Sequence, residues 1–104
     1  MAYKLRFVQT FDKNNEESFL QWEKKFMELE EKTPELKGGK RYVPVIGREA
    51  TNTLIWEAEY DSMEEATRSL EALENNGMHD ELLKHQVAYM RDAYIELYRV
   101  LQRD

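Results

Sequence analysis

The chain has 104 residues, no cysteine and a formal net charge of -6 at pH 7. A disulfide framework and a zinc ribbon are therefore excluded, and the acidic balance argues against a nucleic-acid partner, because phosphate binding needs a cationic face. Charged residues make up 35% of the sequence and aromatic residues 12%, which together are typical of a folded, well-solvated domain rather than a disordered segment.

The first part of the sequence predicts a strand followed by a helix. Apolar side chains at Tyr3, Leu5 and Phe7 alternate with more polar neighbours, which is the period of a strand with one buried face. Asn14 or Asn15 is then expected to cap a helix of about four turns. The apolar stripe of this helix consists of Phe19, Trp22, Phe26 and Leu29.

A second strand is predicted over residues 41–49. It contains Pro44 and Gly47. Because a proline cannot donate to a neighbouring strand, this segment should lie at an edge of the sheet, be bulged, or both. Residues 50–52 are expected to form a short hairpin connection into the next strand.

The next two elements organise the rest of the chain. The first is a strand over residues 53–60, one face of which should lie against the helices. That face carries Leu54, Trp56, Ala58 and Tyr60. Ser62 and Glu65 then form a capping box, in which the Ser62 hydroxyl accepts from the amide of Glu65 and the Glu65 carboxylate accepts from the amide of Ser62. The helix is predicted to end at residues 75–77, Asn-Asn-Gly, in the left-handed conformation.

The last part of the chain is predicted to be a helix and a strand. Asp80 is the expected helix cap, and the helix should continue to Arg91 or Asp92. Residues 93–102 then alternate with the period of a strand.

The predicted order is strand, helix, strand, strand, helix with a helical extension, strand. Two split strand-helix-strand units predict an α+β fold, the ferredoxin-like plait, with an antiparallel sheet and helices on one face. We expect one domain over residues 1–104, because a chain of this length can bury about 65% of its unfolded surface. No segment is apolar enough for a signal peptide or a membrane span, so we expect a cytoplasmic protein.

The sheet face away from the helices should carry both charged and apolar residues. The first and third strands are neighbours in the plait, so Lys4 and Arg6 should pair with Glu57 and Glu59. Together with Ile55, these residues make a face that can lie in water or be covered by a second subunit.

Two segments resemble the NIPSNAP family within the dimeric α/β-barrel superfamily. They are the strand and capped helix LIWEAEYDSMEEATRSLEAL and the closing helix and strand ELLKHQVAYMRDAYIELYRVL. The resemblance implies a homodimer in which two sheets stack face to face as a barrel, with the second strand reaching toward the partner. The sheet face that it turns toward the partner carries Arg6, Ile55, Glu57 and Glu59. Members of the superfamily include cofactor-independent monooxygenases that form quinones, haem-degrading enzymes and small-ligand binders.

The resemblance also implies a pocket for flat, apolar molecules between the sheet and the helices. The aromatic candidates for its walls are Trp22, Phe26, Trp56 and Tyr60, which are equally suited to be core residues. His79 and His85 are the polar candidates, because His85 follows Glu81 by four residues and the two could share a proton or a metal ion. A solvent-exposed pair explains that spacing equally well. The distance in sequence between the two histidines is not a metal-ligand spacing, so no metal is expected.

The expected function is binding of a small apolar or aromatic molecule by a homodimer, with no cofactor, no nucleic acid and no membrane span. One alternative is a cofactor-independent monooxygenase acting on an aromatic substrate, and another is a structural or interaction protein without a pocket. The sequence has no P-loop, serine elbow or dinucleotide fingerprint that would decide between these classes.

Overall fold

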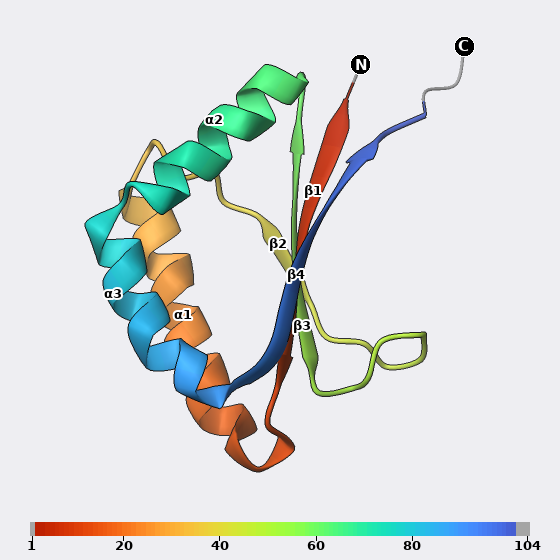
Figure 1. Ribbon diagram of the computed structural model, residues 1–104, viewed down its shortest axis with the longest axis vertical. Coiled ribbons are helices and arrows are strands. Elements are labelled where there is room, and N and C mark those ends of the chain that lie inside the picture. Colours follow the sequence, from red (N-terminus) through yellow and green to blue (C-terminus); the bar gives the residue numbers. More distant parts are fainter. Residues whose placement is uncertain (1, 102–104) are drawn as a thin grey trace.

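The computed structural model describes residues 2–101 as an antiparallel sheet with helices on one side (Figure 1). The elements in chain order are β1 (Tyr3–Phe11), η1 (Lys13–Asn15), α1 (Glu16–Lys32), β2 (Lys40–Tyr42), β3 (Thr53–Tyr60), α2 (Met63–Glu74), α3 (Gly77–Gln86), η2 (Val87–Tyr89) and β4 (Met90–Arg99). The strand order β2-β3-β1-β4, with every neighbouring pair antiparallel, confirms the expected ferredoxin-like plait. The sheet of one chain is open and does not close into a barrel.

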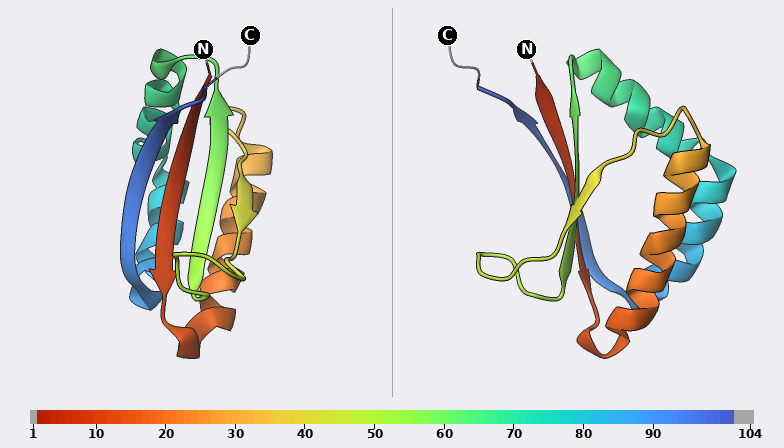
Figure 2. Two further views of the ribbon diagram at one scale, coloured as in Figure 1. Left: turned by 90° about the vertical axis from the view of Figure 1, so that its right-hand side faces the viewer. Right: turned by 180° about the vertical axis from the view of Figure 1, so that it is seen from behind.

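The two faces of the sheet differ in what covers them. All three α-helices lie on one side, while the loop between β2 and β3 projects from the other (Figures 1 and 2). Figure 2 shows the helix-free face with the strands side by side and this loop in front of them. None of the helices within residues 2–101 is long and apolar enough to cross a lipid bilayer.

The pairing of β1 with β3 places opposite charges side by side on the helix-free face. Lys4 lies opposite Glu59, and Arg6 lies opposite Glu57. Arg6 Nε is 2.8 Å from a carboxylate oxygen of Glu57, and Lys4 Nζ is 3.6 Å from Glu57 and 4.0 Å from Glu59. The ion pairs expected across the ladder are therefore present. On the far side of β1, Arg6 Nη1 also lies 3.2 Å from Glu96 of β4.

The second strand is much shorter than the sequence predicted. The prediction of a strand over residues 41–49 is wrong, because β2 ends at Tyr42. Residues 43–52 form a long loop instead of a short hairpin connection. Only three residues of β2 pair with β3. Pro44 explains the early end, since it has no amide to continue the ladder. The predicted position at an edge of the sheet is confirmed.

The capping box begins α2 nearly as predicted. The Glu65 amide donates to the Ser62 hydroxyl over 3.1 Å, but the Glu65 carboxylate accepts from the amide of Asp61 instead of Ser62. The predicted left-handed end at residues 75–77 is wrong, because no described residue has a positive φ. Asn76 begins the next helix instead.

The third helix starts earlier and ends earlier than the sequence predicted. Asn76 caps α3, since its side-chain oxygen accepts from the amide of His79 over 2.8 Å, so Asp80 lies in the first turn and is not the cap. The helix ends at Gln86, and the 3₁₀ turn η2 leads into β4 at Met90 instead of residue 93. The predicted end of the last strand at residue 102 lies outside the described residues.

The core between sheet and helices consists of two separate clusters. The first contains Leu5, Trp56, Ala58, Tyr60 and Ala66, with Phe7 and Leu70 packed against it. The second contains Phe11, Phe19 and Leu54, with Leu20, Tyr89 and Met90 packed against it. The clusters lie at opposite ends of β1 and β3, so the middle of the interface between sheet and helices is left less densely filled.

Candidate functional site

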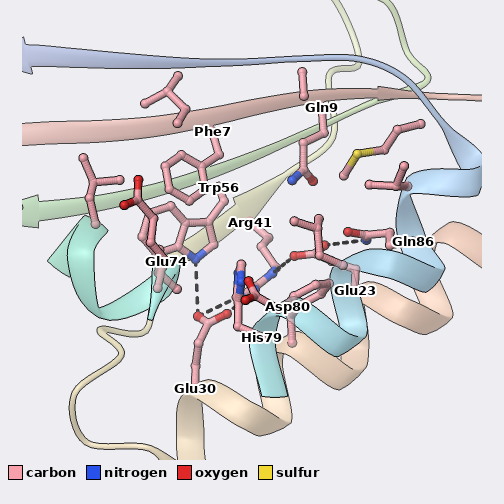
Figure 3. Close-up of a pocket in the computed structure, with 18 of the residues that line it drawn as sticks. Phe7, Gln9, Glu23, Glu30, Arg41, Trp56, Glu74, His79, Asp80 and Gln86 are labelled. Carbon is pink, nitrogen blue, oxygen red and sulfur yellow. Dashed lines mark hydrogen bonds and ion pairs between the residues drawn. The ribbon is translucent and has the colours of Figure 1, made fainter. Parts of the chain in front are cut away.

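A cavity of about 440 Å³ occupies this middle region, between the sheet and all three α-helices (Figure 3). Its apolar walls include Phe7, Phe26, Trp56, Leu70, Leu73, Leu83 and Ile95. Ala93 and Ile95 of β4 line it and are themselves exposed, so the cavity opens to solvent beside β4. Charged and amide side chains gather around Arg41 on the helix side.

The aromatic wall of the cavity is held in place from behind. The Phe7 and Trp56 rings stack with centroids 4.9 Å apart, and the indole Nε1 donates to a Glu30 carboxylate oxygen over 3.3 Å. Gly39 lies directly behind the indole, where a Cβ would come within 2.3 Å of Trp56 Cε2. The position of Trp56 is therefore fixed on several sides before any ligand binds.

Arg41 joins two carboxylates of α1 at the polar side of the cavity. Its Nε donates to Glu23 over 2.6 Å, and its two terminal nitrogens donate to Glu30. All three side chains are largely buried, with exposed fractions of 13% for Arg41, 9% for Glu23 and 12% for Glu30. Burial by itself lowers the pKa of Arg41, but its hydrogen bonds and the charges of the two carboxylates outweigh that effect and leave the pKa raised.

Gln86 completes this polar group from α3. Its Nε2 donates to Glu23 over 2.8 Å and to the carbonyl of Phe19 over 3.4 Å. The orientation of the amide follows from these partners, because a flipped amide would turn its oxygen toward a carboxylate and a carbonyl. The Oε1 atom of Gln86 has no hydrogen-bond partner although the side chain is fully buried. Its partial negative charge is therefore not neutralised by a donor and adds to the negative potential on this side of the cavity.

His79 lies beside the same group, near the start of α3. Its ring contacts Phe26 edge-on, with centroids 5.0 Å apart, and its Nδ1 is buried without a partner. Burial lowers the pKa of His79, although the charges of Asp80, Glu30 and Glu23 act in the opposite direction. At neutral pH the imidazole is therefore uncharged and retains one free lone pair.

The lowered pKa of His79 predicts a loss of stability in mild acid. The pKa of histidine in an unfolded chain is about 6.5. Below that pH the unfolded chain binds a proton that the folded chain does not. The free energy of unfolding therefore falls as the pH is lowered, until the pH passes the pKa of His79 in the folded protein. Replacing His79 by phenylalanine should remove this contribution. Denaturant unfolding at about pH 7.5 and 5.5 should show that the free energy of unfolding of the variant, relative to that of the wild type, increases as the pH falls.

An NMR titration of the His79 ring provides the direct check. Its midpoint should lie below the unfolded value of about 6.5. A midpoint at or above that value, or an equal difference in unfolding free energy at both pH values, would contradict the prediction.

The six residues expected to form a pocket divide into two groups. Phe26, Trp56 and His79 line the cavity, whereas Trp22, Tyr60 and His85 do not. The Trp22 and His85 rings stack on each other outside the cavity, with centroids 4.5 Å apart, and His85 also lies 3.7 Å from Glu81.

Tyr60 belongs to the first core cluster. It is 2% exposed, and its hydroxyl is 2.8 Å from that of Ser69. Burial raises its pKa, because the ionised phenol would lose its solvation. Its hydrogen bond satisfies the hydroxyl within the core, so Tyr60 needs no ligand.

Sequence reasoning missed the polar residues of the site. Glu23 and Glu30 follow Phe19 and Phe26 by four residues each, so they lie on the apolar stripe of α1 and point toward the sheet. A carboxylate repeated on a buried stripe is the signal that would have identified them, because such a group requires a cationic partner. The identity of that partner, Arg41, depends on how β2 pairs with β3.

The expected dimer-facing residues all lie on the helix-free side. Arg6, Glu57 and Glu59 take part in the ion pairs described above, and Ile55 is 8% exposed. A second hollow of about 760 Å³ lies between this face and the loop of residues 43–49. Glu49 of the loop accepts a hydrogen bond from the Tyr94 hydroxyl of β4, which raises the pKa of Tyr94 to about 12.

Comparison with known proteins shows what fold surrounds this site. No protein-family model and no curated protein matches the sequence. Among solved structures, a NIPSNAP family protein from Agrobacterium tumefaciens str. C58 is similar with a TM-score of 0.78, 11% identity and coverage of 100% of this chain and 95% of that one. An uncharacterised NIPSNAP domain protein from Burkholderia xenovorans gives a TM-score of 0.76, 14% identity and coverage of 97% and 95%.

A third similar structure is named for an enzymatic activity. It is an antibiotic biosynthesis monooxygenase, with a TM-score of 0.73, 10% identity and coverage of 96% of this chain and 99% of that one. The resemblance to NIPSNAP proteins expected from the sequence is thus confirmed in the fold. At these identities the similarity establishes the fold alone, so chemistry has to be argued from the site.

Proposed function

We propose that this protein binds a small apolar or aromatic molecule in the cavity between its sheet and its helices, and that it does so as a homodimer. The cavity volume of about 440 Å³ carries the proposal, because ligand sites typically measure roughly 300–1,000 Å³. Stacked Phe7 and Trp56 form a flat wall suited to a ring. The polar group around Arg41 is bonded within itself, so the site is already formed without a ligand.

A fluorescent reporter tests the binding function. The uncharged dye N-phenyl-1-naphthylamine gains fluorescence in an apolar cavity, and we expect that gain with the wild-type protein. Replacing Ala93 by tryptophan would narrow the opening beside β4 and should weaken binding by about tenfold or more. Ala88, which is exposed but does not line the cavity, is the matched control, and its replacement by tryptophan should leave binding unchanged.

Each possible result of this experiment has a clear meaning. An equal fluorescence gain with both variants would place the dye outside the cavity and contradict the proposal. Native mass spectrometry of freshly purified protein complements it by reporting a retained molecule and the oligomeric state together. Absence of any dye binding would favour a structural or interaction protein.

The homodimer is supported by apolar side chains that remain uncovered on the helix-free side. Tyr94 and Tyr98 of β4 are 37% and 43% exposed. The loop after β2 presents Val45 and Ile46, which are 85% and 96% exposed. Apolar groups gathered in this way on one side are typical of an interface. Two such faces brought together would cover both the loop and the edge strand.

Replacing Ile46 by glutamate should weaken self-association by about tenfold or more, because the carboxylate would have to be buried in the dimer. Met78, which is 59% exposed on α3, is the matched control on the opposite side, and Met78→Glu should not change the association. Sedimentation velocity over a range of concentrations measures both. A wild-type monomer at micromolar concentration would refute the dimer.

A second candidate function, a cofactor-independent monooxygenase acting on an aromatic substrate, is favoured by His79. An uncharged imidazole beside an apolar cavity can accept the proton of a phenol, which is the first requirement for oxidising it with dioxygen. The fold similarity to an antibiotic biosynthesis monooxygenase is compatible with this chemistry. Oxygen uptake with 1-naphthol that is lost in His79→Phe would support the monooxygenase. Binding of 1-naphthol without oxygen uptake would refute it and leave binding as the only proposed function.

A further inference from the structure

We propose that the occupant of the cavity is an apolar or aromatic amine in its protonated form, with its ammonium group among the carboxylates around Arg41 and its apolar part against Trp56 and Phe7. This inference rests on the proposed binding function and adds the chemical class of the ligand. It is carried by the balance of charges in the cavity wall, by the partners of the two cations there and by the aromatic rings opposite them.

The cavity wall carries an excess of negative charge. Its carboxylates outnumber its cations by four to two, the carboxylates being Glu23, Glu30, Glu74 and Asp80 and the cations Lys37 and Arg41. With His79 uncharged, two negative charges are left without a partner in the wall. The two carboxylates without a partner, Glu74 and Asp80, are exposed, so solvent screens part of this excess. The remainder favours a cationic ligand and opposes a carboxylate.

Both cations in the wall already have partners within the protein. Three nitrogens of Arg41 donate to Glu23 and Glu30. Lys37 Nζ donates to the carbonyl of Glu59 and lies 4.6 Å from the centre of the Tyr60 ring. A carboxylate ligand would therefore find the donors of Arg41 occupied by Glu23 and Glu30 and would have to draw Lys37 away from its present contacts.

Two further groups point to a cation at the same place. The charges of Asp80, Glu30 and Glu23 all act on His79, so they converge on one region of the cavity, although burial keeps the imidazole uncharged. The fully buried Gln86 presents its amide oxygen without a donor beside Glu23. This oxygen lowers the potential further, in the manner of a fixed dipole.

The apolar part of the wall suits the rest of such a ligand. Phe7 and Trp56 stack on each other and line the cavity with apolar aromatic surface. The opening beside β4 allows a flat molecule to enter with its apolar end trailing toward Ile95, which is 60% exposed. The site thus offers an acidic end and an apolar end in one cavity.

Three ligands of similar size test the inference by displacement of the fluorescent reporter. They are 1-naphthylmethylamine, 1-naphthalenemethanol and 1-naphthoate, which differ chiefly in charge. The amine should displace the dye at about tenfold lower concentration than the alcohol, and the carboxylate should be the weakest of the three. High salt should reduce the preference for the amine, because salt screens the attraction between the ammonium group and the solvent-exposed carboxylates.

Two exposed carboxylates in the wall allow the charge to be changed without disturbing the buried group. Replacing Glu74 and Asp80 by glutamine and asparagine should lower the ratio of amine affinity to alcohol affinity severalfold. Glu71 and Glu81 are the matched controls, because they are exposed on the same two helices but do not line the cavity. Their replacement by glutamine should leave the amine-to-alcohol ratio as in the wild type.

The outcomes separate this inference from the function on which it rests. Dye binding that is weakened by Ala93→Trp would show that the dye occupies the cavity. If the amine then displaces the dye no better than the alcohol or the carboxylate does, the cavity binds apolar molecules and the amine proposal is refuted. Equal losses in the wall pair and the control pair would also refute it, since they would indicate a general surface effect. If the dye does not bind, the binding function itself fails.

Discussion

Replacing Arg41 by alanine should lower the free energy of unfolding by about 3–5 kcal/mol. The guanidinium joins Glu23 and Glu30, and all three side chains are at least 87% buried, given exposed fractions of 13%, 9% and 12%. Without Arg41, two largely buried carboxylates of α1 would remain with no cation between them. Denaturant unfolding followed by circular dichroism measures the loss directly.

Two further variants identify the cause of that loss. In a second protein that carries both Arg41→Ala and Glu23→Gln, one uncompensated charge is removed, so part of the stability should return. Arg68, which pairs with Glu64 on the exposed surface of α2, is the matched control, and Arg68→Ala should cost no more than about 0.5 kcal/mol. A loss for Arg41→Ala as small as that of the control would contradict the role assigned to the buried group.

Replacing Gly39 by alanine should lower the free energy of unfolding by about 1–3 kcal/mol and displace the Trp56 ring. A Cβ at this position would lie 2.3 Å from Trp56 Cε2 and 2.6 Å from the carbonyl oxygen of Glu57. Backbone on one side and a packed indole on the other leave little room to move. Because Trp56 forms a wall of the cavity, binding of the fluorescent reporter should fall as well.

Gly38, the preceding residue, is the control for this substitution. A Cβ there would have no neighbouring atom within 4 Å, so Gly38→Ala should change stability by no more than about 0.5 kcal/mol. Near-ultraviolet circular dichroism reports the environment of Trp56 in both variants. An unchanged spectrum for Gly39→Ala would show that the indole tolerates the methyl group.

The sequence predicted those parts of the fold where local signals agree. The alternation in β3 and the capping box at Ser62 identified the strand and the helix correctly, because the buried face of the strand and the hydroxyl cap act over a few residues. Asn76 was misinterpreted for a physical reason. The same residue type can end a helix in the left-handed conformation or begin the next helix by accepting an amide proton, and the folded chain uses the second option.

The site was less predictable than the fold because it depends on contacts between distant segments. The aromatic wall at Trp56 and the lining position of Phe26 follow from helix and strand periods. The partnership of Glu23 with Arg41 and Gln86 joins three elements, and no local spacing specifies it. His79 and His85 lie in the same helix, yet only His79 lines the cavity, because their spacing in sequence places them on different faces of α3.

The division of the core into two clusters has a consequence for how this protein can evolve. Leu5 and Tyr60 lie in one cluster and Phe11 and Phe19 in the other, so much of the apolar burial that stabilises the fold lies at the two ends of the sheet. Side chains in the middle, such as Leu73 and Leu83, are only partly buried, and changing them costs less stability than changing a fully buried residue. Selection can therefore reshape the binding region for a new molecule while the scaffold remains folded, which separates the adaptable part of the chain from the part that must be kept.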